Sequence, residues 1–383
     1  MTPLPSNEEK ERLWERYRAG RPERVPVILS TNDRVYLLDP RYNVEGLTYD
    51  RAFADPEQML LAQLHWQELV RSHHHRYCDY PAGLPEQWEV GVAFQNVSEA
   101  WFFGCPLDFH PGQVPDTRPI LHDDNKRAVF AVDIDHPLAR DPYRRGIELC
   151  ERMMELARHR EYRGRPIKVL PYLPTGSDGP VTVALNLRGA GFLLDLALDP
   201  DYASELMAFI VQAAINRARA VLRYWGRELH GVGLADDGIE ALSQAMYREQ
   251  VLPHHRRFYD ALDPEHRLPR SMHLCGDDGR HFPVIVRELG VRSLDTGFPL
   301  DFAWLRQAVG PEVEIVGGVE VATLLHGGPA EVYARAREIL TSGVLAGRRF
   351  VLREANNLPP GVPEENLAAM YQAAFDYGCY EAG

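Results

Sequence analysis

Cysteine is scarce in this chain of 383 residues. The five cysteines are an odd number and follow no repeated spacing, so they cannot all pair within one chain. A low and unpatterned cysteine content argues against a disulfide framework and is typical of a reducing compartment. We therefore expect free thiols and a cytoplasmic protein.

The chain also has no excess of basic over acidic residues and no long apolar run. Lys and Arg number 42 against 55 Asp and Glu, which gives a formal net charge of −13. Nucleic-acid binding needs basic patches that replace counterions, so we expect no nucleic-acid partner. No stretch approaches the roughly 20 apolar residues that span a bilayer, and the opening MTPLPSNEEKERLWERY has no apolar signal segment. The sequence therefore predicts no membrane association.

Short apolar runs alternate with segments of helical periodicity. Runs typical of buried strands lie at 24–30, 166–174, 230–238, 268–277, 290–297, 313–320 and 348–357, and 76–81 is a weaker eighth. One of the helical segments, 329–343, begins at Pro329 and ends at Gly343. Such alternation indicates parallel strands joined by crossover helices. Eight strands would close a (β/α)8 TIM barrel, and an open doubly wound sheet is the alternative.

The barrel is favoured because polar residues follow the ends of these strands, where barrel active sites lie. We expect a single domain, 1–383. The segment 82–140 does not follow the rhythm, and its apolar runs suggest antiparallel strands separated by turns rich in Pro and Gly. We therefore predict an inserted, partly antiparallel segment near the barrel mouth. Trp101, within the apolar stretch AWFFG, is its candidate substrate-binding residue.

His273 and Cys275 stand two residues apart at the end of a predicted strand and so point to the same side. An imidazole and a thiolate are the ligands that Zn²⁺ prefers. Asp295 follows the next strand and Glu354 ends the last one, so in a closed barrel all four side chains would converge on one metal site. The alternatives are a buried cysteine beside a pocket histidine, or His273 acting as an acid/base group without metal.

Two adjacent carboxylates, Asp236 and Asp237, end the run 230–238. Successive strand residues point in opposite directions, so at most one of them faces the pocket. We take Asp237 as a catalytic candidate and Asp236 as a substrate-binding candidate, the alternative being that Asp237 caps the following helix. Glu320, which follows the glycine pair of GGVE, is a second catalytic candidate.

The segments HLCGDDG, LGVRSLDTGFPLDFAWLRQAVGPEVEIVGGVEVATLLHGGP and FVLREANN resemble the C-terminal half of the uroporphyrinogen decarboxylase superfamily. The segments 179–207 and 235–262 resemble it too, and 82–140 resembles it least. The resemblance thus covers most of the chain, and it implies a (β/α)8 barrel.

That superfamily has two main chemistries. Its decarboxylases need no metal and hold an acidic tetrapyrrole with an arginine-rich N-terminal loop, to which RAGR at 18–21 is only superficially similar. Its methylcobamide:coenzyme M methyltransferases bind zinc through a His-x-Cys pair, which His273 and Cys275 match, and through a distant cysteine. That cysteine would fall at about Asn356, so a carboxylate would have to replace it, and we take Asn356 as a substrate-binding candidate.

The resemblance therefore implies a zinc- and corrinoid-dependent methyltransferase that moves a methyl group between a corrinoid protein and a small molecule. Two alternatives are kept. One is a metal-free carboxy-lyase, similar to uroporphyrinogen decarboxylase, that acts on a carboxylated substrate. The other is a barrel that binds a small molecule without catalysis.

Overall fold

The computed structural model describes residues 4–380, so the first and last three residues of the predicted domain lie outside it. Its centre is a parallel sheet of five strands in the order β10-β9-β8-β7-β6. The strands are β6 (Val232–Ala235), β7 (Arg270–Leu274), β8 (Ser293–Thr296), β9 (Glu314–Val319) and β10 (Phe350–Glu354). Ala235, His273 and Asp295 are register partners on three adjacent strands, so these strand ends meet at one edge of the sheet.

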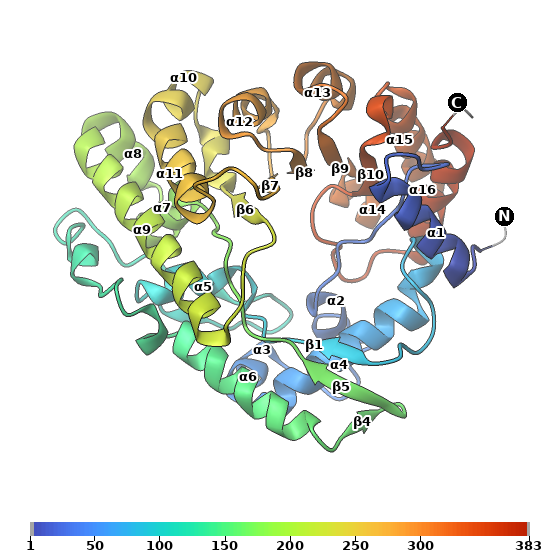
Figure 1. Cartoon of the computed structure of the whole chain (residues 1–383), viewed down its shortest axis with the longest axis horizontal. Coiled ribbons are helices and arrows are strands. Elements are labelled where there is room, and N and C mark those ends of the chain that lie inside the picture. Colours follow the sequence, from blue (N-terminus) through green and yellow to red (C-terminus); the bar gives the residue numbers. More distant parts are fainter. Residues whose placement is uncertain (1–3, 381–383) are drawn as a thin grey trace.

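Helices lie outside the strands in an arc (Figure 1). They include α7 (Pro180–Arg188), α8 (Gly191–Leu198), α9 (Pro200–Trp225), α11 (Leu252–Leu262), α12 (Phe282–Leu289), α13 (Phe302–Val309), α15 (Pro329–Thr341) and α16 (Glu364–Tyr377). Three more come from the N-terminal part: α1 (Asn7–Arg18), α4 (Pro56–Ser72) and α6 (Tyr143–Ala157). The predicted helix 329–343 is confirmed as α15. Within the described chain no single helix has the length and hydropathy of a membrane span, although the pair α7 and α8, bent by 115°, meets that test jointly.

The predicted closed barrel is confirmed only in its coarser form, an α/β fold with a central parallel sheet. Val27 forms an isolated parallel bridge to β10, and Ser177 forms one to β6, so both edges of the sheet gain a flanking segment. A closed ring of eight strands is not detected in residues 4–380. One reason is local: Pro26 has no N–H, and the N–H of Val27 binds the Asp79 carboxylate instead of a strand.

The segment 82–140 differs from its prediction. Its first run supplies β1 (Trp88–Val90), which pairs in parallel with β5 (Arg165–Val169). The run AWFFGCPLDF is expected to be a strand, but its residues 100–102 form the end of α5 (Ser98–Phe102) and only its residues 107–108 are in a strand. The run RAVFAVDID, also expected to be a strand, contains a 3-10 helix. The one antiparallel pair there within the described residues joins β2 (Leu107–Asp108) to β3 (Asp116–Thr117). Three or four apolar residues in a row do not distinguish a short helix from a strand.

Side chains alternate along β7, and this alternation positions the site. Arg270, Met272 and Leu274 are buried, whereas Ser271 and His273 are partly exposed and line a cavity on the concave side of the sheet. On β6 the matching inward positions are Gly233 and Ala235. The inward face of these two strands is therefore built mainly of small residues, which leaves room beneath the strand ends.

Candidate metal and substrate site

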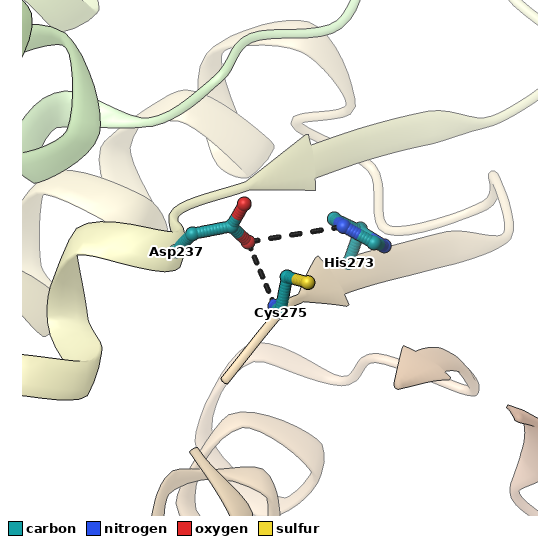
Figure 2. Close-up of side chains that lie close together, drawn as sticks. All are labelled: Asp237, His273 and Cys275. Carbon is teal, nitrogen blue, oxygen red and sulfur yellow. Dashed lines mark hydrogen bonds and ion pairs between the residues drawn. The ribbon is translucent and has the colours of Figure 1, made fainter. Parts of the chain in front are cut away.

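Three potential ligands of one metal ion meet where β6 and β7 end. Ligand atoms of Asp237, His273 and Cys275 all lie within 4.8 Å of one another. Figure 2 shows His273 on β7, Cys275 directly after the end of this strand, and Asp237 at the start of the short helical segment that follows β6. One carboxylate oxygen of Asp237 accepts the backbone N–H of Cys275 over 2.8 Å and lies 3.8 Å from Nε2 of His273.

The local sequence explains why these three side chains converge. His273 and Cys275 share one side because their spacing matches the two-residue period of a strand. Gly276 has a φ of +119°, which lets the chain turn away directly after the cysteine. A Cβ on Gly276 would also overlap the carboxylate of Glu240, so a larger residue does not fit at this turn.

Asp295 fixes the ring of His273. Its Oδ2 lies 2.8 Å from Nδ1 of His273, and its other oxygen is paired with Arg353 at 2.8 Å. Nδ1 therefore carries the proton of that hydrogen bond, and Nε2 is the nitrogen left to face the Asp237 carboxylate. Burial lowers the pKa of His273, but the hydrogen bonds to Asp295 and Cys275 and the nearby carboxylates outweigh it and raise the pKa to about 10. Burial raises the pKa of Asp237, and the charge of His273 opposes that shift.

Asn356 approaches the cluster from the loop after β10. Its Nδ2 donates to Sγ of Cys275 over 2.8 Å, while its Oδ1 accepts the N–H of Asn357 over 2.7 Å. The second bond fixes which end of the amide faces the sulfur, because a backbone N–H can only donate. The position that the resemblance assigned to a distant cysteine is thus in contact with Cys275.

Two cavities meet at this cluster. The outer one, of about 920 Å³, is lined by residues of the cluster and by Asn96, Val97 and 112–117 of the predicted insertion. The inner one, of about 460 Å³, lies among the strands. Asp178, Ala235, His273 and Asp295 line both. The segment 82–140 therefore does flank the site, through a different set of residues from those expected.

Asp178 is a site residue that sequence reasoning missed. Its carboxylate faces both cavities and receives no hydrogen bond from the described part of the chain, while its backbone N–H binds Glu99. Burial and the charge of Glu99 raise the pKa of Asp178 to about 7. The signal was present, because Asp178 follows the strand-like run 166–174 as the other candidates follow theirs. Arg34 and Arg353, which line the outer cavity, were missed as well.

Two predicted residues point elsewhere. Asp236 is fully buried and accepts bonds from Val181, Thr182 and His255, so it caps α7 and does not contact the cavities. Glu320 forms an ion pair of 2.7 Å with Arg335 on α15 and lines neither cavity in the described residues. These placements do not support substrate binding by Asp236 or catalysis by Glu320. Of the two adjacent aspartates, Asp237 is the one that faces the site.

The other two placements are also corrections. Glu354 is fully buried and accepts the N–H of Ser30 over 2.6 Å, so the structure does not bring it to the metal ligands. Strand alternation explains this, since Arg353 faces the outer cavity and its neighbour faces away. Trp101 packs on Phe53 and Phe94, with ring centroids 6.4 and 5.4 Å away, and lies outside the cavity linings of residues 4–380.

Comparison with known proteins identifies the family of this chain. Residues 89–377 match the family described as Uroporphyrinogen decarboxylase (URO-D). The chain belongs to the uroporphyrinogen decarboxylase family. The family prediction is thereby confirmed.

Relatives within the family differ in activity. A methylated-thiol–coenzyme M methyltransferase of Methanosarcina mazei is 28% identical over 77% of this chain and 72% of its own length. A methylcobamide:CoM methyltransferase of the same organism is 22% identical over 96% and 98%. A uroporphyrinogen decarboxylase of Gloeobacter violaceus is 25% identical over 45% and 48%. A solved methyltransferase structure from Methanosarcina mazei matches the fold with a TM-score of 0.63 at 19% identity, over 97% of this chain and 99% of that chain.

Proposed function

We propose that this protein is a zinc-dependent methyltransferase that moves a methyl group between a corrinoid, carried by a partner protein, and a small molecule. The observation that carries this proposal is the cluster of Asp237, His273 and Cys275 at the junction of two cavities. The two relatives matched over the greater part of this chain, both named as methyltransferases that act with coenzyme M, support it over the alternatives.

The side chains present fit a zinc ion. A nitrogen, a sulfur and a carboxylate oxygen within 4.8 Å are a donor set that Zn²⁺ accepts, and three protein ligands leave one position for substrate. We propose His273, Cys275 and Asp237 as the ligands, so that Asp237 supplies the carboxylate expected from Asp295 or Glu354. When bound, zinc would lower the pKa of a coordinated thiol and keep it as a thiolate at neutral pH.

The surrounding residues prepare these ligands. Asp295 holds the His273 ring through Nδ1, which leaves Nε2 as the metal-facing nitrogen, and Arg353 holds Asp295 in turn. Asn356 donates to the sulfur of Cys275 and so fixes the position of that sulfur beside His273 and Asp237. The chain thus supplies an oriented imidazole and a positioned sulfur at the strand ends.

The decarboxylase alternative finds less support in the cavity. A substrate with several carboxylates needs several unpaired cationic groups. Arg18 and Arg21 of the RAGR segment are exposed and line neither cavity in the described chain. Arg353 is paired with Asp295, which leaves Arg34 as the outer-cavity arginine with no ion pair to a carboxylate in residues 4–380. A non-catalytic barrel would need no convergent ligand cluster, and one is present.

Metal content and methyl transfer test the proposal together. We expect protein prepared without chelator to hold about one zinc per chain, and zinc-loaded protein to demethylate free methylcobalamin when a small thiol is added, either the anionic coenzyme M or the cationic 2-aminoethanethiol. The readout is the loss of the methyl–cobalt absorbance. Protein that neither binds zinc nor demethylates methylcobalamin would contradict the proposal. Decarboxylation of uroporphyrinogen by the metal-free protein would support the first alternative.

A further inference from the structure

The interior below the cluster is unusually open. The interior of a (β/α)8 barrel is normally filled by layers of bulky side chains. Here the inner cavity of about 460 Å³ is lined by Gly176, Ser177, Gly233 and Ser271, which are too small to fill that space. Its volume lies in the range of small-molecule sites, and it connects to the ligand cluster through His273.

The arginine in the lining of this cavity is already neutralised. Arg217 is buried and forms an ion pair of 2.6 Å with the buried Glu99. The same guanidinium donates to the hydroxyl of Tyr143 over 2.7 Å and to the carbonyl of Gly176. Glu99 in turn accepts the hydroxyl of Ser177 over 2.9 Å. Arg217 therefore has little positive charge to offer an incoming anion.

Asp178 is the contrasting group. It lies at the junction of the two cavities, and its carboxylate has no hydrogen-bond donor among residues 4–380. Two backbone features fix its place: its own N–H binds Glu99, and the next residue, Gly179, has a φ of +88°. A Cβ on Gly179 would overlap the carbonyl of Ala235, so the backbone here is packed against β6. The carboxylate is thus held facing an open space with an unused acceptor.

We propose that the inner cavity binds the small substrate of the methyl transfer, and that the Asp178 carboxylate accepts a hydrogen bond from a cationic, ammonium-type end of it. His273, the other basic side chain of this lining, is bound to Asp295 through Nδ1, so no unpaired basic group remains among the described residues that line the inner cavity. The identification of the bound molecule as the substrate of methyl transfer rests on the proposed function. The binding preference itself follows from the cavity alone, and it can be measured without any methyl transfer.

Three probes of similar size and different charge test the preference: 2-methoxyethylamine, 2-methoxyethanol and methoxyacetate. We expect the ammonium probe to bind most tightly, by roughly tenfold over the neutral alcohol, which corresponds to one charge-assisted hydrogen bond. Methoxyacetate should bind most weakly. Isothermal titration calorimetry on the protein as purified gives the order of the three affinities. A repeat after zinc removal shows whether methoxyacetate binds only because its carboxylate coordinates the metal.

The isosteric variant Asp178→Asn isolates the carboxylate. It should weaken the ammonium probe by roughly tenfold and leave 2-methoxyethanol unchanged, while Asp124→Asn, at an exposed aspartate, should change neither. Ser271→Leu should block all three probes by filling the cavity. The proposal would be overturned if the zinc-free protein bound methoxyacetate more tightly than 2-methoxyethylamine. It would also be overturned if Asp178→Asn kept the same preference for the ammonium probe as the wild type. If the protein bound the ammonium probe selectively but did not demethylate methylcobalamin, the binding preference of the cavity would be supported and the proposed methyltransferase function would be contradicted.

Discussion

The side-chain amide of Asn356 donates a hydrogen bond of 2.8 Å to the sulfur of Cys275. The first residue lies beyond β10 and the second at the end of β7, so the fold brings together positions 81 residues apart. The resemblance to zinc methyltransferases places a cysteine ligand at about Asn356. The amide reaches the site, but its Nδ2 donates a hydrogen bond and does not replace a thiolate ligand, so the zinc site that we propose takes its third protein ligand from Asp237.

Asn356→Cys should therefore strengthen zinc binding. A thiolate at this position would add a ligand of the type zinc prefers, and we expect the dissociation constant to fall by at least roughly tenfold. Competition with a chromophoric chelator under reducing conditions measures it. Asn356→Ala is the matched control, because it removes the hydrogen bond to Cys275 without adding a ligand, and its affinity should not exceed that of the wild type. Equal affinities for Asn356→Cys and the wild type would show that position 356 does not reach the metal.

Removal of a ligand should release the metal without unfolding the chain. Cys275→Ser and Asp237→Asn each replace a charged ligand by a neutral group, and we expect both to retain well below one zinc after dialysis. Both sites lie at the edge of the sheet, so the melting temperature of the metal-free variants should stay near that of the metal-free wild type. Cys379→Ser, at an exposed cysteine, serves as the control. Full zinc occupancy in Asp237→Asn would remove Asp237 from the ligand set.

Asp295 and Glu320 allow a paired test of two carboxylates, of which the sequence suggested the first as a metal ligand and the second as a catalytic residue. Asp295→Asn loses the acceptor that orients His273 and should weaken zinc binding by about 10- to 100-fold. Glu320→Gln breaks an ion pair to Arg335 away from both cavities, so zinc affinity and methyl transfer should be unchanged. Zinc titration of both variants and of the wild type measures these affinities. A loss of affinity in Glu320→Gln would show that the cluster extends beyond the residues assigned to it.

The sequence was sufficient for the features that depend on period and spacing. Short apolar runs between segments of helical periodicity placed β6 to β10, and the two-residue spacing put His273 and Cys275 on one side of the chain where β7 ends. The same rule stated that only one of Asp236 and Asp237 faces the pocket. It could not say which one, because that choice depends on α7, whose first N–H groups bind Asp236.

The remaining errors come from tertiary contacts that no local pattern contains. Glu354 and Asp295 both end strands, yet Glu354 turns away from the site while Arg353 faces it. Trp101 was placed in a pocket for its aromatic side chain, but it packs against Phe53 and Phe94. Asp178 was overlooked although it follows a strand-like run. Counting polar residues after every predicted strand, without requiring a known motif, would have included it.

Asp278 should make the stability of the protein depend on pH. It is fully buried, and neither carboxylate oxygen has a hydrogen-bond partner within the described chain. Burial, followed by the charges of Asp237 and Glu240, raises the pKa of Asp278 to about 8. The ordinary value in an unfolded chain is about 3.9. Between those two values the folded state keeps a proton that the unfolded state releases, so the free energy of unfolding falls as the pH rises through this window.

Asp278→Asn removes that titration while keeping the size of the side chain. The difference in unfolding free energy, variant minus wild type, should therefore increase with pH between about 4 and 8, by up to about 1.4 kcal/mol per pH unit. Urea denaturation of the zinc-free proteins at several pH values measures it, and contributions from all other groups cancel in the comparison. Asp277→Asn, at the exposed neighbour, should give a curve parallel to the wild type. If Asp278→Asn also ran parallel to the wild type from pH 5 to 8, the buried carboxyl would be ionised in the folded protein, and a partner such as a bound cation or water would be required beside it.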